Sequence, residues 1–336
     1  MRWSLNGSRH WNTVTHLLFY SFIYVCIQGS LGLIWNAFDI SYWRCKIKRS
    51  QYCPDPDIRF YIYTPENRFR IPIDIRSKVP LRYKGWDENK RNVIIIHGFN
   101  GTERKSPMTI IRNAYLNRGD YNVFTVDFED LMLFPCYLSS LSNTRLVAQC
   151  AAQFYSYLTA NGLRAKDTHC VGHSLGAHIC GMISNHLSKK MYKIIGLDPA
   201  RPLVDRYGGH AFRLTRDDAH IVQVIHTNAG LLGESPQVGH VDFCVNGGSM
   251  QPGCLKEGRR IRQARCSHFM SACFFAATVS DRGSAHKAVP CSASCSRALP
   301  GYRLPGRAIS MGQHTPETAR GTYCIRMDDS KRCPFD

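Results

Sequence analysis

One short motif combines residue types and spacing that suit a nucleophile. Residues 172–176 (GHSLG) match the pattern G-x-S-x-G, and they lie where a predicted strand passes into a predicted helix. Glycines on both sides of Ser174 leave room for a sharp turn, which lifts the hydroxyl clear of the sheet and places it at a helix N-terminus. The bare pattern is common, and a glycine-rich turn without chemistry is the alternative. The strand before the motif and the helix after it favour a nucleophilic serine.

A serine hydroxyl attacks an ester only when a base takes its proton and an acid orients that base. Asp198 directly follows the next predicted strand, so in a right-handed parallel arrangement it should lie beside Ser174 at the same edge of the sheet. Other acidic residues fall in polar loop segments and are weaker candidates, namely Asp205, Asp217 and Asp218.

The base is harder to select, because the sequence contains 14 histidines. His226 ends a predicted strand, and His240 lies in a segment that we expect to be structural. His268 follows Cys266 on a predicted loop, where a disulfide would hold an otherwise mobile imidazole in place. With His268 the chain order of serine, acid and histidine is that of α/β hydrolases, so we prefer it, while the residues alone leave the alternatives open.

Acyl transfer also needs hydrogen-bond donors for the negative charge that develops on the carbonyl oxygen. The backbone N–H group of Leu175, which follows the serine, is one candidate. The second is the N–H group of Phe99, in the loop after the predicted strand at residues 93–97. The alternative for residues 97–99 is a plain turn that ends a strand.

Strands and helices alternate along the chain in a way that would position these residues. Predicted strands cover residues 58–63, 93–97, 121–127, 168–171, 193–197 and 221–226. Predicted helices cover residues 109–117, 144–158 (with Asn143 as the N-cap) and 175–187. This alternation is typical of βα units. We therefore expect an α/β fold with a central, mostly parallel sheet flanked by helices.

The N-terminus and the cysteine count indicate the secretory pathway. Residues 17–27 form an apolar run between a short basic segment and small or polar residues, which predicts a cleaved signal peptide over residues 1–30. A signal anchor that continues to residue 35 is the alternative. Removal of Cys26 would leave an even number of the 15 cysteines, and disulfides persist in oxidising compartments. We expect a secreted, extracellular protein in which residues 31–336 form one α/β domain.

The composition excludes several classes of protein. A hydrophobic fraction of 44% with 20% charged residues is ordinary for a globular chain, and excludes disordered, collagen-like and multi-span membrane proteins. The formal net charge of +18 favours an anionic partner, or serves solubility alone. No nucleic-acid-binding signature and no metal-ligand spacing of cysteines occur in the sequence. We therefore expect neither nucleic acid nor a metal nor a cofactor.

Taken together, the motifs resemble the pancreatic lipase family of serine esterases. The resemblance covers about residues 53–335 and rests on the segments IHGF (96–99), FPCY (134–137), VGHSLG (171–176), GLDPA (196–200), VIHT (224–227), GHVDF (239–243), NGG (246–248) and CSH (266–268). It implies an α/β-hydrolase fold and a catalytic triad of Ser174, Asp198 and His268. It also implies an oxyanion hole formed by Phe99 and Leu175.

The resemblance implies part of the disulfide pattern as well. It pairs Cys53 with Cys136 and Cys254 with Cys266. Three further cysteines fall on a strand or on the core face of helices, where we expect buried thiols (Cys150, Cys170 and Cys180). The remaining cysteines are expected to pair among themselves or with Cys45, namely Cys244, Cys273, Cys291, Cys295, Cys324 and Cys333.

The loop between Cys254 and Cys266 is the lid in this family, and here it has only eleven residues. Triacylglycerol lipases of the family carry a lid roughly twice as long, enough for an amphipathic helix over the site. The short lid and the short loop at residues 227–239 resemble the phospholipases A1, particularly the insect-type and venom-like members. Five basic side chains line this lid and would attract a phosphate or an anionic surface, with a solvated loop as the alternative (Lys256, Arg259, Arg260, Arg262 and Arg265).

The sequence therefore predicts hydrolysis of the sn-1 acyl ester of glycerophospholipids at a membrane or lipoprotein surface, through an acyl-enzyme on Ser174. A triacylglycerol or carboxylester lipase is one alternative. A lipid-binding or yolk-type protein without catalysis is another, although such relatives typically lose the nucleophile. Met270 stands where the family usually has arginine, and Asp205 and Arg206 preserve a calcium loop only in part, so no metal is expected.

Two expectations concern the surroundings of this domain. The sequence ends at Asp336 without a C-terminal β-sandwich, so we expect no colipase-type partner. Residues 100–102 (NGT) form a glycosylation sequon beside the predicted oxyanion loop, where a glycan on Asn100 could crowd the site.

Overall fold

The computed structural model describes residues 45–280, 286–291, 294–295 and 304–328. The chain divides into two units, residues 1–46 and residues 47–336, and the fold given below is that of the second unit. The predicted signal peptide at residues 1–30 and the start of the predicted domain lie outside the described residues. Within the described ranges, no helix is both long enough and apolar enough to cross a bilayer.

The second unit is built on one large sheet with the strand order β10-β9-β11-β8-β7-β6-β5-β3-β4-β1-β2. The strands are β1 (Arg59–Tyr63), β2 (Ile71–Ile73), β3 (Arg91–Ile96), β4 (Tyr121–Asp127), β5 (Thr168–His173), β6 (Met191–Leu197), β7 (Ala219–His226), β8 (Val241–Val245), β9 (Lys287–Pro290), β10 (Ile309–Ser310) and β11 (Gly321–Ile325). In this spatial order, every neighbouring pair between β11 and β4 is parallel. The strands β1, β2, β9 and β10 pair antiparallel at the two edges. This confirms the predicted α/β-hydrolase fold.

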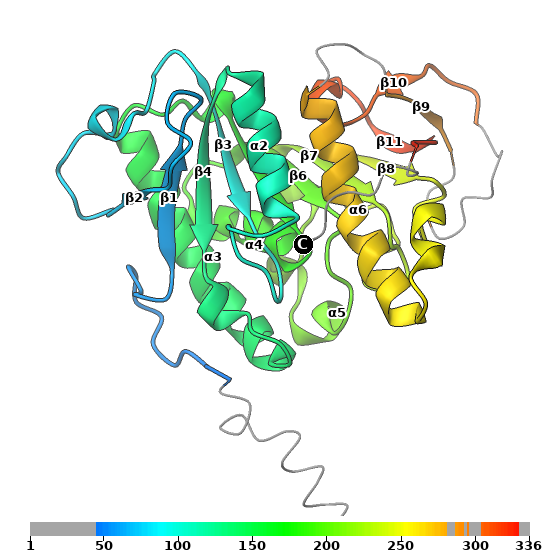
Figure 1. Cartoon of the computed structure of the whole chain (residues 1–336), viewed down its shortest axis with the longest axis horizontal. Coiled ribbons are helices and arrows are strands. Elements are labelled where there is room, and N and C mark those ends of the chain that lie inside the picture. Colours follow the sequence, from blue (N-terminus) through cyan, green and yellow to red (C-terminus); the bar gives the residue numbers. More distant parts are fainter. Residues whose placement is uncertain (1–44, 281–285, 292–293, 296–303, 329–336) are drawn as a thin grey trace, which may run out of the picture. The chain divides into compact units, whose positions relative to one another are not determined.

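Helices cover both faces of the sheet, as Figure 1 shows. They are α2 (Met108–Arg118), α3 (Tyr137–Ala160), α4 (Leu175–Ile183), α5 (Val204–Tyr207) and α6 (Arg260–Ser280). Alternate residues of β3 belong to two separate cores: Ile94 packs with α3 and α4, and Val93 packs with α2 and α6. Because both faces of β3 are buried, its sequence is a continuous apolar run rather than an alternating one.

The parallel connections bring several loops to one edge of the sheet. Strands β3, β5, β6 and β7 run side by side, so their carboxyl ends face the same way, toward the bottom of Figure 1. His173 at the end of β5 pairs with Leu197 at the end of β6. The residues that follow these two strands, Ser174 and Asp198, therefore lie next to each other at this edge, as the sequence predicted.

Helix α3 begins earlier than predicted. The sequence placed its start at residue 144 with Asn143 as the N-cap, but the helix begins at Tyr137. Asn143 is buried inside the helix, where its Oδ1 accepts a hydrogen bond from the backbone N–H of Lys48 at 2.9 Å. The hydroxyl groups of Ser139 and Ser140 donate back to the carbonyl oxygen of Cys136, at 2.9 and 2.8 Å. These bonds satisfy polar side chains that otherwise favour the end of a helix.

The disulfide prediction was partly wrong. The described disulfides are Cys53–Cys150, Cys170–Cys180, Cys244–Cys295, Cys254–Cys266 and Cys291–Cys324. Cys53 thus pairs with Cys150 and not with Cys136, which belongs to another disulfide. Cys150, Cys170 and Cys180 are buried, but they are not free thiols. A strand and the helix that follows it lie in contact, and this brings the Cα atoms of Cys170 and Cys180 within 6.0 Å.

The remaining cysteine predictions had mixed outcomes. Cys254 and Cys266 pair as the resemblance implied. Cys244, Cys291, Cys295 and Cys324 pair among themselves, as expected. Cys273 is also disulfide-bonded, and Cys333 lies outside the described residues.

Candidate active site

Ser174 lies in a sharp turn between β5 and α4. Its backbone has φ 59° and ψ −124°, a strained conformation that residues with a Cβ atom seldom adopt. The glycines on either side permit this turn. A Cβ atom on Gly172 would lie 2.2 Å from the carbonyl oxygen of Gly176, and one on Gly176 would lie 2.2 Å from the carbonyl oxygen of Ile96. The turn therefore requires glycine at both positions, as the motif predicted, and Ser174 stands at the N-terminus of α4.

Asp198 is completely buried, and donors hold both of its carboxylate oxygens. Its Oδ1 accepts hydrogen bonds from the backbone N–H groups of Thr227 and Asn228, at 2.9 and 3.0 Å. Its Oδ2 lies 2.6 Å from Nδ1 of His268. These three contacts fix the orientation of the carboxylate toward the imidazole.

His268 is buried and forms the other half of this pair. Because its Nδ1 faces a carboxylate, that nitrogen carries the proton and Nε2 is left as an acceptor, the tautomer that a general base needs. Of the histidines that the sequence left open, His268 is the one whose ring contacts Asp198. Its predicted place on a loop was wrong, since it lies in α6, whose apolar side chains pack into the core beside the sheet from Cys266 onward.

His173 supports His268 from the neighbouring strand. Its Nε2 donates to the backbone carbonyl oxygen of His268 at 3.2 Å, and the two rings lie 4.6 Å apart. Burial, and next the proximity of His268, lowers the pKa of His173 well below its ordinary value. A neutral ring beside His268 adds no repulsion when His268 takes a proton.

The loop after β3 packs directly against the serine turn. A Cβ atom on Gly98 would lie 2.7 Å from Cβ of Ser174 and 3.1 Å from the backbone nitrogen of Leu175. This close approach requires glycine at position 98. Phe99, the second predicted oxyanion-hole residue, directly follows this point of close approach.

His97 orients the peptide group that carries the Phe99 N–H. The backbone N–H of Phe128 donates to Nε2 of His97 at 3.1 Å, so the ring proton is on Nδ1. That proton is directed to the carbonyl oxygen of Gly98 at 2.9 Å. The Gly98 carbonyl and the Phe99 N–H belong to the same planar peptide, so His97 sets the direction of this N–H group. Sequence reasoning did not identify this role of His97.

Gln251 is a second residue that the sequence did not reveal. Its side chain is buried, and its Nε2 donates to the carbonyl oxygens of Thr227 and Val245, each at 3.0 Å. Its backbone N–H donates to Oγ of Ser267, the neighbour of His268, at 2.9 Å. Gln251 thus ties the loop that holds Asp198 to the helix that holds His268. A single glutamine has no pattern that would have indicated this.

The lid segment, residues 255–265, is partly helical. The short 3₁₀ helix η7 (Pro252–Lys256) includes the first two residues of the lid, and α6 begins at Arg260, so the second half of the lid is the first turn and a half of α6. All five basic residues of the lid are exposed. We call this segment the basic lid.

The other sequence candidates have different hydrogen-bond partners. His240 accepts a hydrogen bond from the backbone of Val222, which is the structural role predicted for it. Asp218 accepts the N–H of Thr215, and Asp217 is exposed in the same turn. His226 contacts Asp242 instead of Asp198.

Comparison with known proteins connects this site to a family. The model of the Lipase family matches residues 37–303. The chain is similar to Lipase member H-B of Xenopus laevis, with 31% identity over 67% of this chain and 49% of that protein. It is similar to Phospholipase A1 of the wasp Vespula squamosa, with 35% identity over 60% of this chain and 72% of that protein. The chain spans about half the length of the Lipase member H relatives that it matches.

Among solved structures, the chain is distantly similar to a phospholipase/carboxylesterase from Dyadobacter fermentans. The TM-score is 0.31 and the identity is 11%, over 50% of this chain and 70% of that one.

Proposed function

The chain belongs to the lipase family, that of pancreatic lipase, and on this premise we propose that it is a secreted serine esterase that cleaves the sn-1 acyl ester of glycerophospholipids. The observation that carries the proposal is the 2.6 Å hydrogen bond between Nδ1 of His268 and Oδ2 of Asp198, at the same sheet edge as the Ser174 turn. A buried carboxylate that holds an imidazole in this tautomer beside a strained serine is the arrangement of a serine hydrolase.

The reaction uses the groups in a fixed order. Oγ of Ser174 attacks the ester carbonyl while Nε2 of His268 takes its proton, and Asp198 stabilises the imidazolium that forms. The backbone N–H groups of Leu175 and Phe99 donate to the oxyanion. His268 then returns the proton to the leaving lysophospholipid, and water releases the fatty acid from the acyl-enzyme by the same steps.

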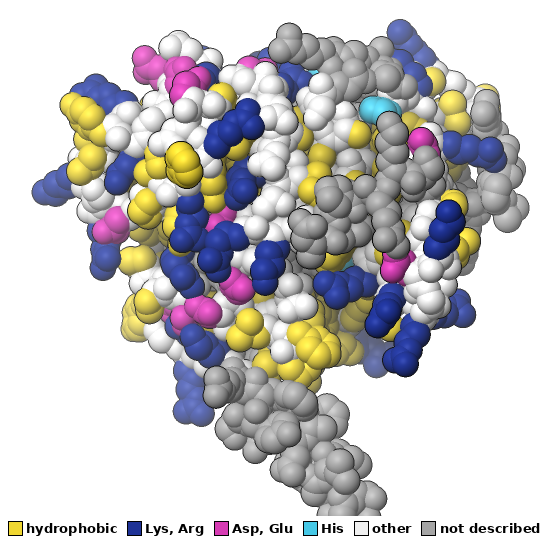
Figure 2. Space-filling model, in the orientation of Figure 1, with side chains coloured by type: hydrophobic (Ala, Val, Ile, Leu, Met, Phe, Trp, Pro, Cys, Tyr) yellow, Lys and Arg dark blue, Asp and Glu magenta, His cyan; other side chains and the backbone are white. Residues whose placement is uncertain are grey.

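The basic lid supports a phospholipid surface as the place of reaction. Two apolar side chains of this segment are also exposed, Leu255 at 57% and Ile261 at 66%. Figure 2 shows Lys and Arg side chains gathered where α6 begins. Exposed apolar groups among cations are suited to insertion into the headgroup layer of an anionic membrane. A neutral triacylglycerol droplet has no phosphate groups for these cations.

Two further observations support the proposal. The similarity to the wasp protein named Phospholipase A1 agrees with a phospholipid substrate. Five described disulfides agree with secretion, because such bonds persist outside the reducing cytosol.

The test is fatty-acid release by the purified protein from phosphatidylcholine, phosphatidylserine and phosphatidic acid vesicles and from a triolein emulsion. Ser174→Ala is compared with wild type, and Ser188→Ala, at an exposed serine, serves as the matched control. We expect release that requires Ser174 and leaves a 2-acyl lysophospholipid. Release from triolein alone would overturn the phospholipid assignment. Equal release by wild type and Ser174→Ala would overturn the esterase itself.

A further inference from the structure

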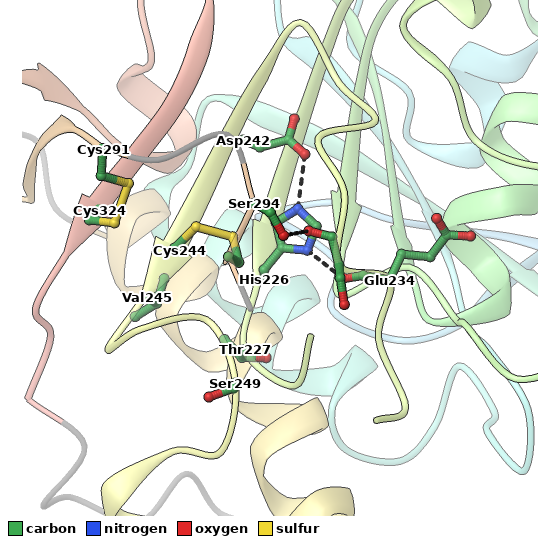
Figure 3. The surroundings of a disulfide bond; sticks show 12 residues. His226, Thr227, Glu234, Asp242, Cys244, Val245, Ser249, Cys291, Ser294 and Cys324 are labelled. Atoms are coloured by element: carbon green, nitrogen blue, oxygen red, sulfur yellow. Dashed lines mark hydrogen bonds and ion pairs between the residues drawn. A yellow bond between two sulfur atoms is a disulfide. The ribbon is translucent and has the colours of Figure 1, made fainter. Parts of the chain in front are cut away.

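His226 is a second buried histidine near Asp198, and both of its ring nitrogens face acceptors (Figure 3). It ends β7 and has no exposed surface. Its Nε2 lies 2.9 Å from Oδ2 of Asp242, and its Nδ1 lies 3.0 Å from the backbone carbonyl oxygen of Glu234. A neutral imidazole has a proton on only one nitrogen, so it cannot satisfy both contacts.

The remaining contacts of Asp242 decide where the second proton resides. Its Oδ1 accepts the backbone N–H of Gly239 at 2.9 Å, and its Oδ2 accepts the backbone N–H of Val238 at 3.0 Å. A carboxyl group whose two oxygens accept N–H groups is best satisfied as a carboxylate. The carbonyl oxygen of Glu234 can only accept. Both protons therefore belong to His226, which makes it an imidazolium.

The charges around the ring agree with this assignment. Burial opposes a charged ring, but the hydrogen bond to Asp242 and the charges of Asp242 and Asp198 outweigh it and raise the pKa of His226. Asp242 contacts the ring from β8, and Asp198, directly after β6, acts through its charge alone. The side chain of Glu234, on the loop between, extends away from the ring in Figure 3. On the remaining side, the neighbouring Cys244 and Cys295 form a disulfide and do not titrate.

The imidazolium fastens the loop at residues 227–240 at two points. One is the carbonyl oxygen of Glu234, and the other is Asp242, which holds the N–H groups of Val238 and Gly239. The beginning of the same loop donates the Thr227 and Asn228 N–H groups to Asp198. The loop that fixes the triad carboxylate is thus itself fixed by a buried charge.

A disulfide supports this loop from outside. Oγ of Ser294 donates to the carbonyl oxygen of Ser235 at 3.2 Å, and the next residue, Cys295, is bonded to Cys244 of β8. Figure 3 shows Ser294 and Cys244 beside His226. The loop is therefore held by the charged His226 and by a hydrogen bond from a residue next to a disulfide, and only the contact with His226 depends on pH.

We propose that His226 in its charged form is a positioning residue for Asp198, and that loss of its proton at alkaline pH loosens the loop and lowers esterase activity. The activity part rests on the proposed function, whereas the charge of His226 does not. Above the raised pKa of His226, the ring keeps the proton that faces the Asp242 carboxylate, and Nδ1 becomes a lone pair that faces the carbonyl oxygen of Glu234. The resulting repulsion would act on the loop that presents the Thr227 and Asn228 N–H groups.

The charge is tested by ¹⁵N NMR of the full chain with labelled histidine. At about pH 8, exposed histidines are neutral, and we expect one imidazole with both nitrogens protonated. Its signal should be absent from His226→Gln. If that variant does not fold, Asp242→Asn provides the assignment, because the asparagine amide can donate to Nε2 and leave His226 neutral. Only neutral imidazoles in the wild type would overturn the proposal.

Activity on a soluble ester tests the positioning role. For Asp242→Asn we expect kcat to fall on the order of 10- to 100-fold with little change in KM, and the alkaline limb of the pH profile that belongs to His226 to disappear, because His226 is already neutral in this variant. If the His226–Asp242 contact were merely structural, the variant would lose activity but keep the alkaline limb of its pH profile. The matched control is Asp217→Asn, an exposed acid, for which the profile should not change. A retained alkaline limb in Asp242→Asn overturns the inference, while an inactive wild type overturns only the proposed function.

Discussion

A Cβ atom on Gly233 would lie 2.4 Å from Oδ1 of Asp198. The backbone of the loop after β7 therefore packs directly against the Asp198 carboxylate at Gly233. The same loop also donates two N–H groups to this carboxylate. Asp198 is enclosed by a loop 29 to 35 residues further along the chain, and not by its own strand alone.

Gly233→Ala should therefore displace Asp198. The added methyl group cannot fit beside Oδ1, so the carboxylate or the loop must move and His268 loses its alignment. We expect kcat on a soluble ester to fall by about 100-fold or more with KM little changed. The control is Gly209→Ala, because a Cβ atom at that position would contact nothing within 4 Å. Wild-type kcat in a folded Gly233→Ala protein would contradict the site described here.

Two variants distinguish the two hydrogen bonds of the His97 ring, to the Gly98 carbonyl oxygen and from the Phe128 N–H group. His97→Asn places an amide near the Nδ1 position, so it can still donate to the Gly98 carbonyl oxygen. His97→Gln places its amide near Nε2 and loses that bond. We expect the glutamine variant to lose on the order of 100-fold in kcat, and the asparagine variant to retain most of it. Equal losses in soluble-ester assays would show that His97 does not act through the Gly98–Phe99 peptide.

The basic lid should matter for vesicles and not for soluble substrates. Replacing Arg259, Arg260 and Arg262 together with glutamine should lower binding to anionic vesicles on the order of 10- to 100-fold at about 0.15 M salt, with a weaker salt dependence. Vesicle sedimentation and a soluble-ester assay measure the two effects.

The control for the lid removes three exposed lysines elsewhere, by replacing Lys166, Lys189 and Lys190 with glutamine. They precede β5 and β6 and so lie at the opposite edge of the sheet. Equal losses in the two triple variants would attribute vesicle binding to net charge and not to the lid.

Lys193 is a buried cation that should destabilise the fold. It is 5% exposed on β6, and burial lowers its pKa to about 8. A folded pKa below the unfolded value of 10.5 means that the uncharged form favours folding, so stability is lost as pH falls from 10.5 to about 8 and stays lost below that. Lys193→Met should raise the free energy of unfolding by roughly 1–3 kcal/mol at about pH 7 and by less near pH 10.5.

Denaturant unfolding at both pH values checks this, with exposed Lys190→Met as the control. A lower stability of Lys193→Met at neutral pH would contradict it, and would mean that the ammonium group is satisfied in the fold.

The sequence predicted the parts of the fold whose cause is local. Strand β3 is visible in the sequence as an apolar run because both of its faces are buried, and the Ser174 turn is visible because only glycine fits at positions 172 and 176. Asp198 followed from the rule that parallel strands end at one edge.

Other parts depend on contacts between distant residues and had no local signal. The choice of His268 as the base needed the family resemblance. The segment before it lies between two cysteines and was predicted to be a loop, although α6 begins within it at Arg260. Cys53 forms a disulfide with Cys150, which lies 97 residues away in the sequence, so only the packing of α3 determines its partner. Gln251 and His97 act through hydrogen bonds to backbone groups, and such bonds leave no periodic pattern in a sequence.

The sulfur atoms of Cys244, Cys291 and Cys324 lie within 4.8 Å of one another, although they belong to two different disulfides. During oxidative folding a thiolate of either pair can attack the other with little backbone motion, so isomers of equal mass are within easy reach. Preparations made without a disulfide isomerase are expected to contain such isomers. Rates should therefore be referred to the fraction of Ser174 that a covalent inhibitor labels, and not to total protein.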